Sequence, residues 1–76
     1  MPSSTPAQLG QAIRRLRSSR NMSIEALAAD ADIHTTYLSG IENGRRNPSW
    51  RVVGALADVL DVKISDLARE AEQARK

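Results

Sequence analysis

The sequence contains no cysteine, no phenylalanine and a single histidine among its 76 residues. The lack of cysteine excludes disulfide bonds and thiolate metal sites, and His34 alone cannot build a zinc site. We therefore expect no bound metal and no cofactor. The chain also has no run of about 18 apolar residues, which a membrane-spanning helix would need, and no signal-peptide core. This composition predicts a soluble, cytoplasmic protein with no membrane partner.

Patterns typical of enzymes are missing as well. There is no glycine-rich phosphate-binding loop, and the one histidine has no persuasive catalytic partner. Two neighbouring acids, Glu70 and Glu72, fall in a polar stretch and are best explained as solvated charges. We therefore predict no catalytic residues and no enzymatic activity, and no small-molecule site is evident.

Apolar residues recur at helical spacing along the whole chain. Leu9, Ile13 and Leu16, for example, follow one another at intervals of four and three residues. A chain of this length forms one domain, near the size at which a helical bundle depends on good packing. The pattern predicts an all-α fold, a compact bundle of five helices.

Local signals mark where several of these helices begin. Thr5, Pro6 and Gln8 form a capping-box pattern with a proline at the first helical position. Ser23 and Ser49 stand where the second and fourth helices need an N-cap.

The middle of the chain predicts two short helices joined by a tight turn. They span about residues 24–31 and 35–43, with Asp32 and Ile33 in the turn and His34 or Thr35 at the cap of the second helix. This layout is that of a helix-turn-helix, in which the second helix is the recognition helix. The resulting division is a disordered arm at 1–4, a helix-turn-helix domain at 5–71 and a frayed tail at 72–76.

Positive charge is clustered although the formal net charge is only +2. Four arginines lie in residues 14–20 and three more in residues 45–51. Clustering favours binding to a polyanion, because binding depends on the local field and not on the sum over the molecule. For Arg14, Arg15, Arg20 and Arg51, however, a solvated charged face is the better explanation.

Several short strings, taken in order, resemble one known family. They are IRRLR at 13–17, EALA at 25–28, YLSGIENG at 37–44, RNPS at 46–49 and LA at 56–57. At this spacing, which covers roughly residues 9–67, the chain resembles the phage-repressor helix-turn-helix family. That family includes Cro, repressor-type and xenobiotic-response-element proteins and the controller proteins of restriction-modification systems. The resemblance implies a lambda-repressor-like DNA-binding domain.

The chain departs from the family pattern at four positions. Asn21, Asp32 and Asp61 stand where the family commonly has glycine just past a helix, in a backbone conformation with positive φ. Asn and Asp tolerate that conformation better than other non-glycine residues, so the fold should survive at a small cost. Ile24 stands where a hydrogen-bonding side chain is usual, which puts that contact with DNA in doubt.

The resemblance also implies which residues meet DNA. Contacts to base edges are expected from residues on the outer side of the recognition helix, namely Thr35, Thr36, Ser39 and Gly40. Contacts to the DNA backbone are expected from residues around it, namely Arg17, Ser23, His34, Tyr37, Asn43, Arg45 and Arg46. Arg17 and Glu42 are also expected to form a structural ion pair that fixes the recognition helix.

Some of these positions have competing structural explanations. Thr35 could simply cap its helix, and Tyr37 could be a partly buried core residue. Gly40 is interpreted as clearance for a close approach, either by DNA or by the helix at 24–31. Trp50 belongs to the apolar stripe of the fourth helix, so we expect it in the core or at an interface.

The function implied by the resemblance is sequence-specific binding of double-stranded DNA. We expect a transcriptional regulator, a repressor or controller, that binds a palindromic operator as a homodimer, at least on DNA. The predicted dimer surface lies on the last helix and consists of Ile64, Leu67, Ala68 and Ala71. The alternative is a protein-interaction adaptor or antitoxin-like module that uses the same scaffold without reading DNA.

Overall fold

The computed structural model describes residues 5–73, and within them it contains five helices and no strand. The helices are α1 (Pro6–Ser19), α2 (Ile24–Asp30), α3 (Thr35–Glu42), α4 (Trp50–Val59) and α5 (Ile64–Gln73). The predicted all-α fold class is confirmed. Within this described range no helix combines the length and apolar character needed to cross a membrane.

The predicted ends of the domain need one correction. Glu72 and Gln73 were expected in a frayed tail, but both belong to α5. Burial of Ala71, with 1% exposure, anchors this last turn to the rest of the molecule. The predicted arm at 1–4 and residues 74–76 of the predicted tail lie outside the described residues.

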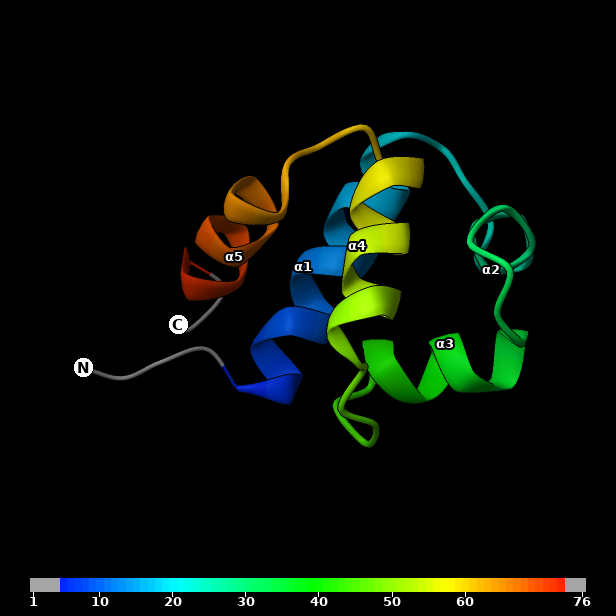
Figure 1. Cartoon of the computed structure of the whole chain (residues 1–76), viewed down its shortest axis with the longest axis horizontal. Helices are drawn as coiled ribbons and strands as arrows, with labels where there is room; N and C mark the ends of the chain where they lie inside the picture. The colour runs from blue at the N-terminus through cyan, green and yellow to red at the C-terminus, as the bar shows by residue number, and fades with distance from the viewer. Residues whose placement is uncertain (1–4, 74–76) are drawn as a thin grey trace.

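Helix α1 lies between α3 and α5. In the view of Figure 1, α2 and α3 lie on one side of α1 and α4, and α5 lies on the other. Helix α1 packs against both α3 and α5, while α2 packs against α3 and α4. The apolar stripes predicted for the helices point into one core, and its largest fully buried side chains are Ile13, Leu27, Leu38, Ile41, Leu56, Leu60 and Leu67.

The predicted helix starts are confirmed by hydrogen bonds. The Thr5 backbone N–H donates to Gln8 Oε1 at 2.7 Å, and the Gln8 N–H donates to Thr5 Oγ1 at 3.2 Å, which completes the capping box. The hydroxyls of Ser23 and Ser49 accept from backbone N–H groups three residues further on, at 3.0 and 3.2 Å. Each cap satisfies a donor that the first turn of a helix leaves unpaired.

The three departures from glycine adopt the conformation that the sequence predicts. Asn21, Asp32 and Asp61 have φ values of 55°, 61° and 60°. Each follows a helix end, and the short polar side chains make this left-handed conformation tolerable. Gly44, directly after α3, has φ of 78° and ends the recognition helix.

Candidate nucleic-acid interface

Helix α3 stands on the molecule with one side buried and the other open. Leu38 and Ile41 have no exposed surface, whereas Thr36 is exposed and Thr35 and Ser39 are half-buried. This division follows from the helical period, which places residues 36 and 39 on the side opposite the buried pair. The hydroxyl-bearing side predicted to read bases therefore faces outward.

The start of α3 shows how His34 and Thr35 are used. His34 occupies the N-cap position, but its side chain makes no capping hydrogen bond, and Thr35 is the first helical residue. The structural explanation of Thr35 as a cap is therefore wrong. His34 is exposed and directly precedes α3, and its contact with the DNA backbone stays a prediction.

A buried ion pair joins α1 to the end of α3. Arg17 Nε and Nη2 donate to the two carboxylate oxygens of Glu42 at 2.8 and 3.0 Å, in a bidentate arrangement. The Glu42 side chain is 2% exposed and that of Arg17 is 16% exposed. Arg17 Nη1 also donates to the Met22 carbonyl oxygen at 2.9 Å, ahead of α2. The predicted structural pair is confirmed, and it also holds the segment before α2.

The electrostatics of this pair keep Arg17 charged. Its hydrogen bond with the Glu42 side chain raises the pKa of Arg17 above its usual value, against a smaller opposing effect of burial. The two bonds to the carboxylate and the one to Met22 involve all three nitrogens of the guanidinium. A phosphate contact by Arg17 stays a prediction, with little of the side chain exposed for it.

Arg14 belongs to the same network, which the sequence analysis missed. Its Nε lies 3.4 Å from Glu42 Oε1, and its Nη2 donates to Asn43 Oδ1 at 3.0 Å. The Arg14 side chain is 53% exposed, so it is solvated as expected, but it also has partners on and after α3. The signal was its position three residues before Arg17, which puts both side chains on one side of α1.

The loop after α3 carries the basic residues onto the same surface. The backbone N–H groups of Arg45 and Arg46 donate to the Gly40 carbonyl oxygen at 2.8 and 3.2 Å. Both side chains are exposed, as is that of Asn43. Asn43 Nδ2 also lies 3.5 Å from Ser39 Oγ, so the polar side chains at this end of α3 are contiguous.

Gly40 leaves room for a side chain of its own chain. A Cβ atom at Gly40 would come within 2.6 Å of Arg46 Cγ, so the glycine provides space for the Arg46 side chain. The close approach within this chain is therefore made by Arg46 and not by α2, and a base contact by Gly40 stays a prediction. The Arg46 guanidinium carbon lies 5.9 Å from the centre of the Tyr37 ring, within cation–π range. Tyr37 itself is half-buried against the core.

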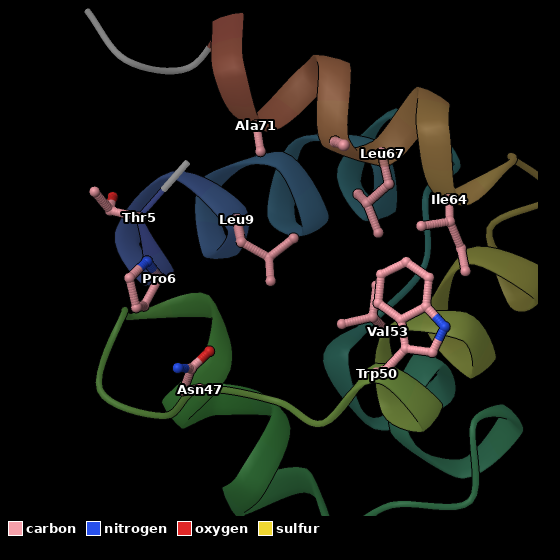
Figure 2. A pocket seen from close by; sticks show the side chains of 10 residues that line it. Thr5, Pro6, Leu9, Asn47, Trp50, Val53, Ile64, Leu67 and Ala71 are labelled. Atoms are coloured by element: carbon pink, nitrogen blue, oxygen red, sulfur yellow. The ribbon is translucent and has the colours of Figure 1, made fainter. Parts of the chain in front are cut away.

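A second exposed feature lies on another face, between the starts of α1 and α4 and the length of α5. It is an apolar hollow of about 260 Å³, lined by Thr5, Pro6, Leu9, Asn47, Trp50, Val53, Ile64, Leu67, Ala68 and Ala71, which we call the Trp50 groove. In Figure 2 the Trp50 indole stands at one side, beside Val53 and Ile64, and Thr5 and Pro6 stand at the other. This hollow could not be predicted from the sequence, because its lining comes from segments far apart in the chain.

The groove corrects two predictions. Trp50 is not a core residue, since 72% of it is exposed. Of the predicted dimer surface, Leu67 and Ala71 are each 1% exposed because they pack into the core of their own chain. Only Ile64, which is half-buried, and Ala68, which is exposed, remain accessible to a partner.

Comparison with known proteins places this geometry in context. A family model described as a helix-turn-helix domain matches residues 8–71. The control protein C.BamHI of Bacillus amyloliquefaciens is 44% identical over 59 residues, which cover 76% of this chain and 73% of that protein. Some other curated relatives are longer, and the chain spans 50% of one regulator and 60% of another.

Solved structures agree with these relatives. The restriction-modification controller protein C.AhdI from Aeromonas hydrophila has a TM-score of 0.80 at 34% identity, over 82% of this chain and 94% of the other. SinR, a master regulator of biofilm formation solved in complex with DNA, has a TM-score of 0.74 at 35% identity, over 78% of this chain and 95% of the other.

Proposed function

We infer that this chain, which belongs to the family of helix-turn-helix domains, is a DNA-binding transcriptional regulator. The family model and the regulators and control proteins among the relatives support this function. The observation that carries it here is the outward side of α3. That side is polar, bordered by the exposed Arg45 and Arg46, and held on a buried scaffold.

In the proposed complex α3 enters the major groove of the duplex. Thr35, Thr36 and Ser39 read base edges there, because a hydroxyl can donate or accept and a threonine methyl can pack on the methyl of thymine. His34, Tyr37 and the residues that follow α3 contact phosphates, which position the protein without reading sequence. Ser23 would add a contact from the start of α2, through the hydroxyl that also caps that helix.

Arg46 is well placed for its proposed phosphate contact. Its stem lies in the space beside Gly40 and its guanidinium lies over Tyr37, so its conformational freedom is already reduced before DNA binds. Ordering a long side chain in advance lowers the entropy that binding must overcome.

We further propose that the protein acts as a repressor or controller and binds a palindromic operator as a two-fold dimer. Helix-turn-helix dimers place their recognition helices about 34 Å apart, one turn of DNA, in successive major grooves. A palindrome then follows from the two-fold symmetry of the protein.

A salt series tests the DNA-binding part of this proposal. Fluorescence anisotropy with a labelled nonspecific duplex should give binding that weakens with salt, with a log–log slope of roughly −3 to −4 for three or four phosphate contacts per subunit. Arg45→Ala and Arg46→Ala should each reduce the slope by about 0.9. Arg69→Ala, which removes the same charge from exposed α5, is the matched control and should leave the slope unchanged.

Two outcomes would contradict the proposal. A wild-type chain that fails to bind duplex even at low ionic strength would favour the adaptor alternative. Slopes that fall equally for Arg45→Ala and Arg69→Ala would mean that binding follows net charge and not the surface around α3.

Base reading needs a separate experiment, selection from a random duplex pool. The wild-type chain should recover a palindrome. Thr36→Ala should relax or change the preference at one position of each half-site, by about 1–3 kcal/mol of discrimination. An unchanged consensus would remove Thr36 from the base-reading set.

A further inference from the structure

We propose that Arg14 fixes the direction of a hydrogen-bond chain that ends on the outward side of α3, so that the Ser39 hydroxyl faces DNA as a donor. Ser39 then reads an acceptor on a base edge, the O4 of thymine or the O6 and N7 of guanine, and disfavours cytosine. The inference rests on the proposed function. It adds the class of base that one position of each half-site contains.

The chain starts beside the buried carboxylate of Glu42. That carboxylate is 2% exposed and lies 3.4 Å from Arg14 Nε, a contact that holds the Arg14 side chain against α3. Arg14 Nη2 donates to Asn43 Oδ1 at 3.0 Å. A guanidinium carries donors and no acceptor, so the Asn43 amide must turn its oxygen towards Arg14. The amide nitrogen of Asn43 is thereby directed to the other side.

The next member of the chain is Ser39, one helical turn before Asn43. Residues four apart share one side of a helix. Asn43 Nδ2 donates to Ser39 Oγ at 3.5 Å, which is a long hydrogen bond. An amide nitrogen cannot accept, so the Ser39 oxygen is the acceptor of this pair and its proton points elsewhere. Within residues 5–73 the Ser39 hydroxyl donates no hydrogen bond of its own, which leaves its proton for DNA.

The fixed direction changes what Ser39 can read. A serine hydroxyl ordinarily serves either class of base, because it can donate or accept. Guanine and thymine, the keto bases, present only acceptors for it in the major groove. Cytosine presents only its N4 amino donor, and adenine presents both a donor and the N7 acceptor. A cytosine at this position would leave the hydroxyl proton unpaired in the interface, which lowers affinity.

Selection from a random duplex pool measures this preference. Ser39→Ala identifies the base pair that Ser39 reads, as the position in each half-site at which the preference disappears. At that pair the wild type should favour its own base pair by about tenfold over the pair with keto and amino bases exchanged between the strands.

Asn43→Asp is the decisive variant because it reverses the chain. A carboxylate has the shape of the amide but accepts only, so the Ser39 proton turns towards it and the Ser39 oxygen faces DNA as an acceptor. The preferred pair should then exchange its keto and amino bases between the strands. Added negative charge also weakens binding to every duplex, but this general loss does not change which base pair is preferred.

Arg14→Ala tests the residue that sets the direction. Without Arg14 the Asn43 amide can present either its oxygen or its nitrogen to Ser39, so the preference should fall below about threefold. The variant leaves Glu42 with both bonds from Arg17. Arg15→Ala removes the same charge from a residue that contacts α5, and is the matched control that should keep the full preference. Thermal melts check that each variant is folded.

Four results would overturn the proposal. They are a consensus unchanged by Ser39→Ala, a preferred pair unchanged by Asn43→Asp, a full preference in Arg14→Ala, and equal losses of preference in Arg14→Ala and Arg15→Ala. The third result, with weaker binding to all duplexes, would make Arg14 a plain phosphate contact. Reversal by Asn43→Asp together with loss in Arg14→Ala alone would support the proposal.

Binding of the wild-type chain to nonspecific duplex separates this inference from the proposed function. A chain that fails to bind duplex at low ionic strength would overturn the function, and the inference with it. A chain that binds duplex and recovers an operator, but whose preferred pair does not respond to Asn43→Asp, would overturn the inference alone.

Discussion

Helix α1 meets its two neighbours in different ways. Towards α3 it sends Arg17 and Arg14 to a carboxylate, Glu42, that is 2% exposed. Towards α5 it sends Arg15 to Glu70, at 3.5 Å and largely exposed to solvent. On the α5 side, the starts of α1 and α4 together with α5 also leave the Trp50 groove open.

The α1–α3 contact and the α1–α5 contact therefore suit different tasks. The α1–α3 junction has no buried side-chain polar atom without a hydrogen-bond partner in the described part of the chain, so the recognition helix is fixed before DNA arrives. The α5 side instead leaves an apolar hollow, the Trp50 groove, open to solvent. Fixed geometry suits base reading, whereas an open apolar face suits reversible assembly.

The largest difference in stability is expected between variants that remove the acidic partner of α1 in α3, Glu42, or in α5, Glu70. Glu42→Ala leaves the largely buried Arg17 without its partner and should lower the free energy of unfolding by about 3–5 kcal/mol. Domains of this size have roughly 5–10 kcal/mol in total. Glu70→Ala removes an exposed pair and should lower it by less than about 1 kcal/mol. Urea denaturation of both variants measures the difference, and equal losses would show that the junction is not specially stabilised.

Replacing a glycine by alanine should lower stability on the α3 side of α1 and raise it between α4 and α5. A Cβ at Gly10 in α1 would lie 2.6 Å from the carbonyl oxygen of Glu42 and closer still to that of Ile41, so Gly10→Ala should destabilise by about 3 kcal/mol. A Cβ at Gly54 in α4 would meet only Ile64 Cδ1, at 3.8 Å.

Gly54→Ala should therefore stabilise by up to about 1 kcal/mol through helix propensity, which raises Tm by about 4–8 °C. Thermal melts of the two variants measure both effects. A stable Gly10→Ala chain would contradict the close α1–α3 approach, and a destabilised Gly54→Ala chain would show that the groove side is also tightly packed.

The smallest effect is expected at the turn that leads to α5. Asp61 has φ of 60° and carries a negative charge just past the end of α4. Asp61→Gly should raise stability by up to about 1 kcal/mol, because glycine adopts this conformation without strain and the charge no longer opposes the helix dipole. Asp61→Ala should give no comparable gain, since alanine tolerates positive φ poorly. A larger gain for alanine would exclude the conformational explanation.

Residues whose role depends on near neighbours could be predicted from the sequence. The capping box of Thr5 and Gln8 and the left-handed residues Asn21, Asp32 and Asp61 all appear where expected. Each depends on contacts within one helical turn, so a short window contains the necessary information. The Arg17–Glu42 pair spans the molecule and was reached only through the family resemblance.

Residues whose role depends on distant segments were predicted less well. The sequence does not indicate that the exposed Arg14 contacts Asn43, or that Gly40 leaves space for the Arg46 side chain. Trp50 shares the spacing of core residues but begins its helix at the surface. Helical spacing predicts on which side of a helix a residue lies. Whether that residue is buried also depends on how far the neighbouring helix extends.

The amino-acid sequence alone determined the number of helices, most of their boundaries, and the hydroxyl-bearing outer side of α3, because periodicity and capping act over a few residues. The tertiary structure decided which of several arginines are tied into the α1–α3 junction, what fills the space beside Gly40, and that an apolar groove opens next to Trp50. Those features come from side chains 20 or more residues apart in the chain or from the curve of a loop, for example the pairing of Arg17 with Glu42 across 25 positions. Only the packing of whole helices brings such groups together or leaves a gap between them.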